Sequence, residues 1–324
     1  MHYPRLFLVS ACTALLSVAA SAQQSAIERI SVKFSNDTSS FSYVRDNRIF
    51  SEGWNALPQV GFWKKVVSLS PDSGLLNIGA SREVVARLPV KTWNFMTSVQ
   101  KDALRDSVRK IYALAPEDRV LFTVGKSDFY DFSHALEIIG KSYPIFESQG
   151  VPAFYAQSIL LIECPGRLQR SSAGAQGHFQ LMPGVAQNMG LKVNKYIDER
   201  KDFDKCATAA AKFVQTVCIP NTVRVLNERG IKYDTGDLWF KLLVLHVYHA
   251  GSGNVAAALD AMPVKPETGS LQLITSLWQT KAASFGNASQ NYSQIALANT
   301  LILYDMLQAT GVDLRTNPYV SAQM

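Results

Sequence analysis

The sequence has few charged residues, few cysteines and no long hydrophobic run after its first 22 residues. Charged residues make up 18% of the 324 positions, and hydrophobic residues make up 47%. A chain with no run of 18 apolar residues after residue 22 is not expected to cross a membrane several times. The large apolar fraction excludes a mostly disordered chain. The length allows a large core and predicts about two domains.

Blocks of like charge are also absent, although the formal net charge is +6. Dispersed positive charge favours weak attraction to anionic polymers and surfaces. A nucleic-acid groove would need basic residues gathered on one face. We therefore expect no nucleic-acid partner, and a basic protein without any charged partner remains an alternative.

The first 22 residues have the pattern of a secretory signal peptide. Arg5 is followed by an uncharged, mostly apolar run over 6–20, and Ala20-Ser21-Ala22 is a small-residue cleavage signature. We expect export to the periplasm or beyond, with no membrane-spanning segment once the signal is removed. A lipid anchor on Cys12 is the weaker alternative, because the apolar run that precedes this residue is short for a signal core.

Cysteine is scarce, and only Cys164, Cys206 and Cys218 follow the signal. The absence of a C-x-x-C pair argues against a zinc or redox motif. An odd count allows at most one internal disulfide. Cys206 and Cys218 are predicted to share a helix, where they would lie about 18 Å apart. A disulfide would therefore include Cys164, and three free thiols are the alternative.

The N-terminal part has a mixed pattern. Residues 23–56 are rich in Ser, Asn, Asp and Thr, which predicts an extended and poorly packed lead-in. Thr97 and Gln100 form a capping-box pair. The helix that follows has a predicted core stripe of Leu104, Val108, Ile111 and Tyr112. A short strand is predicted over 119–124.

From about residue 131 the apolar residues recur at helical spacing, with few strand signals. Proline stands near the start of several predicted helices, where its missing backbone N–H is tolerated. The predicted helices are 131–141, 143–149, 153–163, 183–189, 204–217, 220–228, 237–249, 252–260 and 290–310. The second domain is expected to begin between residues 131 and 150.

The residues best suited to chemistry lie between 158 and 183. Glu163 ends an apolar helix, and apolar neighbours raise the pKa of a carboxyl group by desolvation. Such a group is a candidate general acid near neutral pH. The stretch 171–183 contains two glycines, which let the backbone come close to a ligand. Gln180 adds an amide that both donates and accepts hydrogen bonds.

Four motifs follow one another in this half of the chain. They are Glu163 with the stretch 171–191, the acidic and basic run 198–202 with Thr208-Ala209-Ala210, the stretch 248–255, and Asn291-Tyr292-Ser293. Together they resemble lytic transglycosylases of the soluble-lytic-transglycosylase and goose-type-lysozyme superfamily, with a catalytic domain like that of membrane-bound transglycosylase D. The resemblance implies a mainly α protein. A lysozyme-like helical catalytic domain would span 143–310, after a small α or α+β domain at 23–142 and before a tail at 311–324.

The resemblance also implies the reaction and the site. Peptidoglycan strands would be cut at the β-1,4 bond between MurNAc and GlcNAc, with a 1,6-anhydro-MurNAc end as product. Glu163 would be the single general acid and base. No cofactor and no metal are implied. The residues expected to bind the glycan are Ser171, Gln180, Met182, Tyr248, His249 and Tyr292.

Several positions depart from the family pattern. Cys164 and Cys206 stand where the family often has serine, which suggests a disulfide between them. His178 and His249 replace other residues in motifs expected to face the cleft. These two histidines motivate one alternative to a lytic transglycosylase, a non-catalytic peptidoglycan-binding scaffold. A second alternative is a lysozyme-type hydrolase that uses water. The i, i+3 pair His246 and His249 has no evident third metal ligand. A cell-envelope partner docking on 23–142 is one open role for that region.

Overall fold

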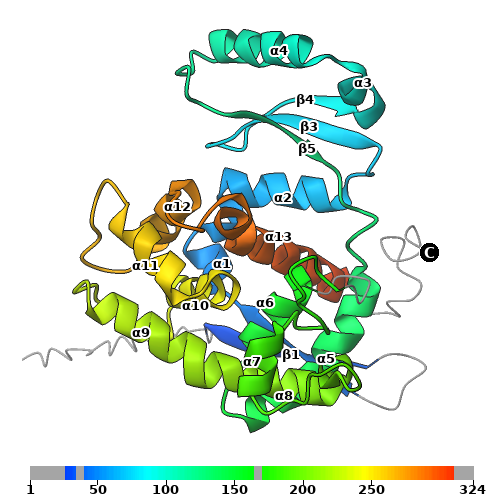
Figure 1. Cartoon of the computed structure of the whole chain (residues 1–324), viewed down its shortest axis with the longest axis vertical. Helices are drawn as coiled ribbons and strands as arrows, with labels where there is room; N and C mark the ends of the chain where they lie inside the picture. Colours follow the sequence, from blue (N-terminus) through cyan, green and yellow to red (C-terminus); the bar gives the residue numbers. More distant parts are fainter. Residues whose placement is uncertain (1–25, 34–39, 164–169, 310–324) are drawn as a thin grey trace, which may run out of the picture.

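The computed structural model describes residues 26–33, 40–163 and 170–309, which form a mainly helical protein with two small sheets (Figure 1). The predicted mainly α fold class is confirmed. The signal peptide, Cys164 and the tail 311–324 lie outside the described residues. Among the described helices, no single one is both long and apolar enough to cross a membrane, while the helices Leu238–Ala250 and Ser252–Asp260 pass that test only as a pair bent by 119°.

The strands are β1 (Ile27–Lys33), β2 (Ser40–Asp46), β3 (Ser73–Ile78), β4 (Val84–Pro89) and β5 (Val120–Val124). The first helices are α1 (Arg48–Ser51), α2 (Pro58–Ser68), α3 (Val90–Phe95) and α4 (Ser98–Ile111). The later helices are α5 (Phe132–Ser148), α6 (Ala153–Glu163), α7 (Pro183–Asn188), α8 (Phe203–Phe213), α9 (Ile219–Asn227), α10 (Leu238–Ala250), α11 (Ser252–Asp260), α12 (Leu271–Gln279) and α13 (Asn287–Ala309).

Residues 70–124 form a unit that we call the sheet domain. Its antiparallel sheet has the order β4-β3-β5, and the sheet lies between α4 on the outside and α2 (Figure 1). The predicted strand at 119–124 is confirmed as β5, and the capping box of Thr97 and Gln100 is present at the start of α4. Ile111 is 76% exposed, so this position of the stripe is wrong. The other three predicted positions, Leu104, Val108 and Tyr112, pack in the core of the sheet domain as expected.

The expectation of a poorly packed lead-in is wrong for β2. This strand pairs with β1 from Ile27↔Asp46 to Lys33↔Ser40 and packs against α5 and α6. Gln157 of α6 accepts from the backbone N–H of Val44 at 3.0 Å and donates to its carbonyl at 2.9 Å. The polar composition was misleading because Ser42 and Asp46 are buried, and the Asp46 carboxylate accepts hydrogen bonds from Arg48 and Lys241.

The remaining elements form what we call the helical body, with one core that runs from Tyr43 to Leu307. Two of its helices, α6 and α10, are apolar and buried on nearly all sides. The long helix α13 packs against α2, α6 and α10. The boundary expected between 142 and 143 falls inside α5, so residues on both sides of it share this core.

Most predicted helices of this region are present, and 153–163 and 252–260 have the predicted bounds. Two differences stand out. The pair 131–141 and 143–149 is one helix, α5, with Pro144 inside it. Proline normally interrupts a helix, but here buried residues before and after it, such as Gly140 and Phe146, hold both halves against the core. Helix α12 was not predicted.

Candidate functional site

Glu163 is the last residue of α6. Its side chain is half-buried, and its Oε1 accepts a hydrogen bond of 2.7 Å from the hydroxyl of Tyr292 on α13. Burial raises the pKa of Glu163 to about 7, although the bond from Tyr292 acts in the opposite direction. The raised pKa expected from the apolar helix is therefore confirmed. A carboxyl group of this kind still holds its proton near neutral pH, as a general acid must.

Tyr292 links Glu163 to a second predicted residue, His249. The ring of Tyr292 is buried, and the imidazole of His249 stacks on it with the ring centroids 4.4 Å apart and the planes 23° apart. His249 itself is exposed at the end of α10. Desolvation against its neighbours lowers the pKa of His249. His249 thus contacts the ring whose hydroxyl binds the Glu163 carboxyl group, and the Tyr292–Glu163 bond is intact.

Tyr248 approaches the same carboxyl group from α10. Its hydroxyl donates to the carbonyl of Phe179 at 2.6 Å. Burial raises the pKa of Tyr248, and the negative charge of Glu163 raises it further. An electrostatic effect of this kind requires the two groups to be close. The structure therefore brings together Glu163, Tyr248 and Tyr292, which lie far apart in the sequence.

The stretch 171–182, which we call the glycine loop, folds as a tight turn beside Tyr248. The hydroxyl of Ser171 accepts from the N–H of Ala175 at 2.9 Å. Gln176 and Leu181 pair through two backbone hydrogen bonds. Gln180 has a φ of 44°, and its side-chain amide donates to the carbonyl of Gly177 at 2.9 Å. These contacts give the loop one defined shape.

Arg200 binds the backbone of the glycine loop. Its guanidinium is almost fully buried, forms two hydrogen bonds with Asp198, and donates to the carbonyls of Gly174 and Leu181 at 2.9 and 2.8 Å. Gly177 passes so close that a Cβ there would lie 2.1 Å from the Arg200 carbonyl oxygen. Only glycine fits at this position, where φ is also +82°. The run 198–202 is thus an ion-paired support of the loop.

The other predicted glycan contacts are Ser171, Gln180 and Met182. Ser171 and Gln180 lie in the glycine loop, and each has a hydrogen bond within that loop. Met182 is the last residue of the loop and is 41% exposed. Nothing in the structure tests binding by these three residues, so their roles stay predictions.

His178 does not face Glu163, contrary to expectation. Its ring packs edge-on against Phe203 of α8 at 4.9 Å and lies 6.3 Å from the ring of His134 on α5. The side chain is buried, and its Nδ1 has no hydrogen-bond partner. Burial, followed by the charges of His134 and Lys141, lowers the pKa of His178 to about 4. The His178 side chain therefore packs against α5 and α8.

Tyr130 is a neighbour of the site that the motifs did not indicate. It is buried before α5, and its pKa is raised by burial and then, against the opposing effect of Asn299, by Glu163. Asn299 of α13 also donates to the carbonyl of Leu161 at 2.7 Å, two residues before Glu163. Nothing in the sequence around Tyr130 indicates that this residue lies near Glu163, because the motifs begin after it.

Cys206 and Cys218 are buried free thiols. The suggested disulfide partner of Cys206, Cys164, lies outside the described residues. Burial raises the pKa of Cys206 to about 11, so this thiol is not poised to react.

The described residues contain no group of three His, Cys, Asp or Glu side chains arranged to hold a metal ion. His246 is fully buried, and its Nε2 is 2.8 Å from the hydroxyl of Ser293. Burial lowers the pKa of His246 to about 3. It faces the interior while His249 faces outward, so the two histidines do not share a site.

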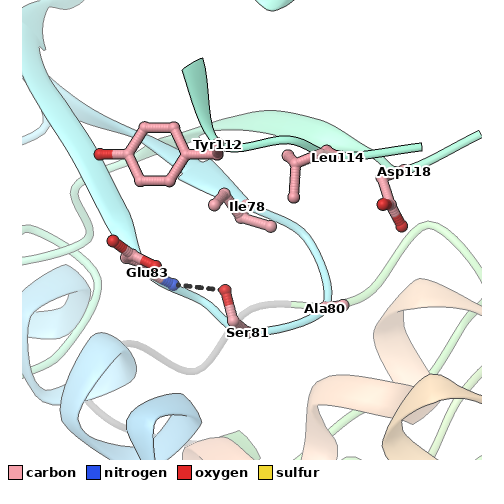
Figure 2. Close-up of a pocket in the computed structure, with 7 residues that line it drawn as sticks. All are labelled: Ile78, Ala80, Ser81, Glu83, Tyr112, Leu114 and Asp118. Atoms are coloured by element: carbon pink, nitrogen blue, oxygen red, sulfur yellow. Dashed lines mark hydrogen bonds between the residues drawn. The ribbon is translucent and has the colours of Figure 1, made fainter. Parts of the chain in front are cut away.

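A cavity of about 320 Å³ lies in the sheet domain, at the end of β3. Figure 2 shows Glu83 and Asp118 at opposite sides of it, with Tyr112 and Leu114 along its wall. None of the residues expected to bind glycan lines this cavity.

Comparisons with known proteins give limited information. No family model matches the sequence, and no curated protein matches it. A solved structure of an inactive mutant of the lytic transglycosylase Slt from Pseudomonas aeruginosa aligns with 55% of this chain at 17% identity, with a TM-score of 0.36. The alignment spans 25% of that chain. So distant a likeness establishes neither fold nor activity, and an assignment of function has to come from the residues around Glu163.

Proposed function

We propose that this protein is an exported peptidoglycan lytic transglycosylase with Glu163 as its general acid and base. The observation that carries the proposal is the setting of Glu163. Its carboxyl group ends an apolar helix, has a pKa near 7, and is bonded by Tyr292 with Tyr248 close by. The order and spacing of the four motifs support the substrate class. Export rests on the signal-peptide pattern of residues 1–22.

In the proposed reaction the protonated Glu163 first donates its proton to the bridging oxygen as the bond to C1 of MurNAc breaks. The C6 hydroxyl of the same sugar attacks C1 and passes its proton to the Glu163 carboxylate. A 1,6-anhydro ring forms, Glu163 is protonated again, and no water is consumed. An intramolecular hydroxyl has a high effective concentration, so a second carboxylate is not needed to activate it.

The same geometry favours transglycosylation over hydrolysis. A hydrolase normally uses a second carboxylate close to the first, as nucleophile or as base for water. A like charge at that distance would raise the pKa of Glu163. Among the described residues, burial raises the pKa of Glu163 against the opposing effect of the Tyr292 bond, and no second carboxyl group contributes to the shift. A lysozyme-type hydrolase is therefore the second candidate.

The scaffold alternative loses part of its motivation. His178 packs against Phe203 of α8, and His249 stacks on Tyr292 without displacing the hydrogen bond from Tyr292 to Glu163. Both departures from the family pattern thus leave the acid and its partner in place.

The test is mass spectrometry of the fragments released from purified sacculi. We expect fragments that end in 1,6-anhydro-MurNAc, one water lighter than reducing ends. Glu163→Gln should reduce release by about 10²–10⁴-fold, the usual contribution of a general acid. Glu137→Gln, the same change on a carboxyl group exposed on α5, is the matched control and should keep full activity.

Three outcomes would contradict the proposal. Reducing ends would favour the hydrolase. Equal release by the wild type and Glu163→Gln would exclude Glu163 as the acid. Binding to sacculi without release by the wild type would favour the scaffold.

A further inference from the structure

The first two turns of α13 carry buried polar side chains that bond to several other elements. Gln290 donates to the carbonyl of Thr280, Ser293 accepts from the indole of Trp278 at 2.7 Å, and Gln294 accepts from the indole of Trp63 at 3.1 Å. Asn291 accepts from Arg82 at 2.7 Å. Tyr292 lies on the same two turns, between Asn291 and Ser293, so the contacts that fix this end of α13 also fix the backbone from which Tyr292 projects.

Arg82 differs from the other partners because it belongs to the sheet domain, at the turn between β3 and β4. Its side chain is 6% exposed. One end of the guanidinium donates to Asn291 and the other to Asn77 at 3.2 Å. Its carbon lies 5.3 Å from the ring centroid of Phe62 and 5.8 Å from that of Trp63. The side chain thus crosses from the sheet domain into the helical body.

This contact has two costs. Among the described residues Arg82 has no carboxylate partner, and burial, together with repulsion from Arg119, lowers its pKa to about 10. A buried cation without a counter-ion is unfavourable. The backbone of Arg82 also has a φ of 60°, which residues other than glycine rarely adopt.

The turn that carries this strain is firmly held. Gln279 of α12 and Gln59 of α2 both donate to the carbonyl of Ala80, at 3.1 and 3.3 Å. Costly conformations that persist in such a frame are characteristic of functional sites. The strained turn places the guanidinium group of Arg82 next to Asn291.

We propose that Arg82 is a positioning residue for Glu163, because it fixes Asn291 and thereby the adjoining Tyr292 in the orientation that bonds the carboxyl group. The inference deepens, and for its catalytic consequence rests on, the proposed role of Glu163. It also assigns a task to the sheet domain, whose sequence resembles no family that we recognise.

The experiment is a titration of the Glu163 carboxyl carbon by NMR in the full chain, with its signal assigned by comparison with Glu163→Gln. The Tyr292 bond lowers the pKa of Glu163, so Tyr292→Phe should raise it. Arg82→Gln should raise it in the same direction and by less. Arg87→Gln, a change on an exposed arginine of β4 in the same domain, should leave it unchanged.

Removal of a cation could raise the pKa of a nearby carboxyl group without any positioning, so two further variants separate the causes. Asn291→Ala keeps the charge of Arg82 and should still raise the pKa of Glu163. Arg82→Gln added to Tyr292→Phe should produce no further rise, because the bond through which it acts is already lost. A second rise in that background, or no rise in Asn291→Ala, would overturn the proposal.

Folding is checked on the same samples by the amide spectrum. If Arg82→Gln does not fold, Asn291→Ala and Arg82→Lys, which keeps the charge and part of the bonding, decide the question in its place. A rise with Asn291→Ala and a smaller one with Arg82→Lys would support positioning, and no rise with Asn291→Ala would refute it.

Activity on sacculi provides the second readout. We expect Arg82→Gln to lower kcat/KM by about tenfold, since small misplacements of catalytic groups have effects of this order or larger, and Arg82→Lys to recover part of the loss. The titration needs no substrate. A wild type that releases no fragments would therefore refute the proposed function, while the titration would still decide whether Arg82 positions Glu163.

Discussion

The helical body and the sheet domain place their charged groups differently. The body buries titratable groups, and burial shifts the pKa of Glu163 up and those of His178 and His246 down. The sheet domain keeps its charges on the surface, for example in the pairs Arg105–Asp102 and Arg109–Asp106 of α4. Its one buried charged residue, Arg82, points into the body. The capacity for acid–base chemistry therefore lies in the body, and Arg82 is the one buried charged side chain that the sheet domain extends into it.

The largest difference between the two regions should appear when one arginine is changed in each. Arg200→Gln removes a buried guanidinium and leaves two loop carbonyls and Asp198 without their partner. We expect a loss of about 3–5 kcal/mol in the free energy of unfolding. Arg105→Gln breaks a partly exposed i, i+3 pair and should cost at most about 0.5 kcal/mol.

Urea unfolding of both variants at neutral pH measures these losses. Equal losses would break the comparison, since they would mean that burial of charge does not distinguish the body from the sheet domain.

The next effect follows from the raised pKa of Glu163. Between its ordinary value of 4.5 and about 7, the folded state binds more protons than the unfolded state. The free energy of unfolding therefore falls as pH rises through this window. Glu163→Gln removes that penalty and should be more stable than the wild type above pH 7, by about 3 kcal/mol at most.

Below pH 4.5 the two proteins should have the same stability, and thermal unfolding across pH 4–8 provides the measurement. Glu137→Gln, on the surface of the same body, should follow the wild type at every pH. A constant difference between Glu163→Gln and the wild type would show that Glu163 has an ordinary pKa.

A smaller effect of opposite pH dependence is expected at His178. The folded-state pKa of about 4 lies below the ordinary 6.5, so the unfolded state binds more protons in between and stability is lost as pH falls. The buried Nδ1 without a partner also has a cost at neutral pH. His178→Met should therefore stabilise by about 1 kcal/mol at pH 7.5 and by more at pH 5. A gain that shrinks on acidification would contradict this account.

The two regions also differ in how much of them the sequence predicted. Uninterrupted apolar runs identified α6 and α10, and the same reasoning gave the raised pKa of Glu163. The break predicted between residues 141 and 143 is absent, because packing on both sides of Pro144 keeps α5 continuous. β2 was missed because its polar residues Ser42 and Asp46 are buried and bond partners outside the strand, which a local composition does not reveal.

The support of the site was not predictable from spacing. Arg200 bonds the carbonyl of Gly174, 26 residues away, and Arg82 bonds Asn291, 209 residues away. A buried charge is defined by the partners that the fold brings to it, and no period in the sequence encodes such pairs. Motifs indicated the groups that would react, while the groups that hold them became visible only in three dimensions.

The most direct test of Glu163 as a general acid is the pH dependence of fragment release from sacculi by the wild type. A general acid must hold its proton, so the account predicts that kcat/KM is lost as pH rises through about 7, the pKa of Glu163. A profile that is flat from pH 5 to 9, or that already falls near the ordinary carboxyl value of 4.5, would contradict it.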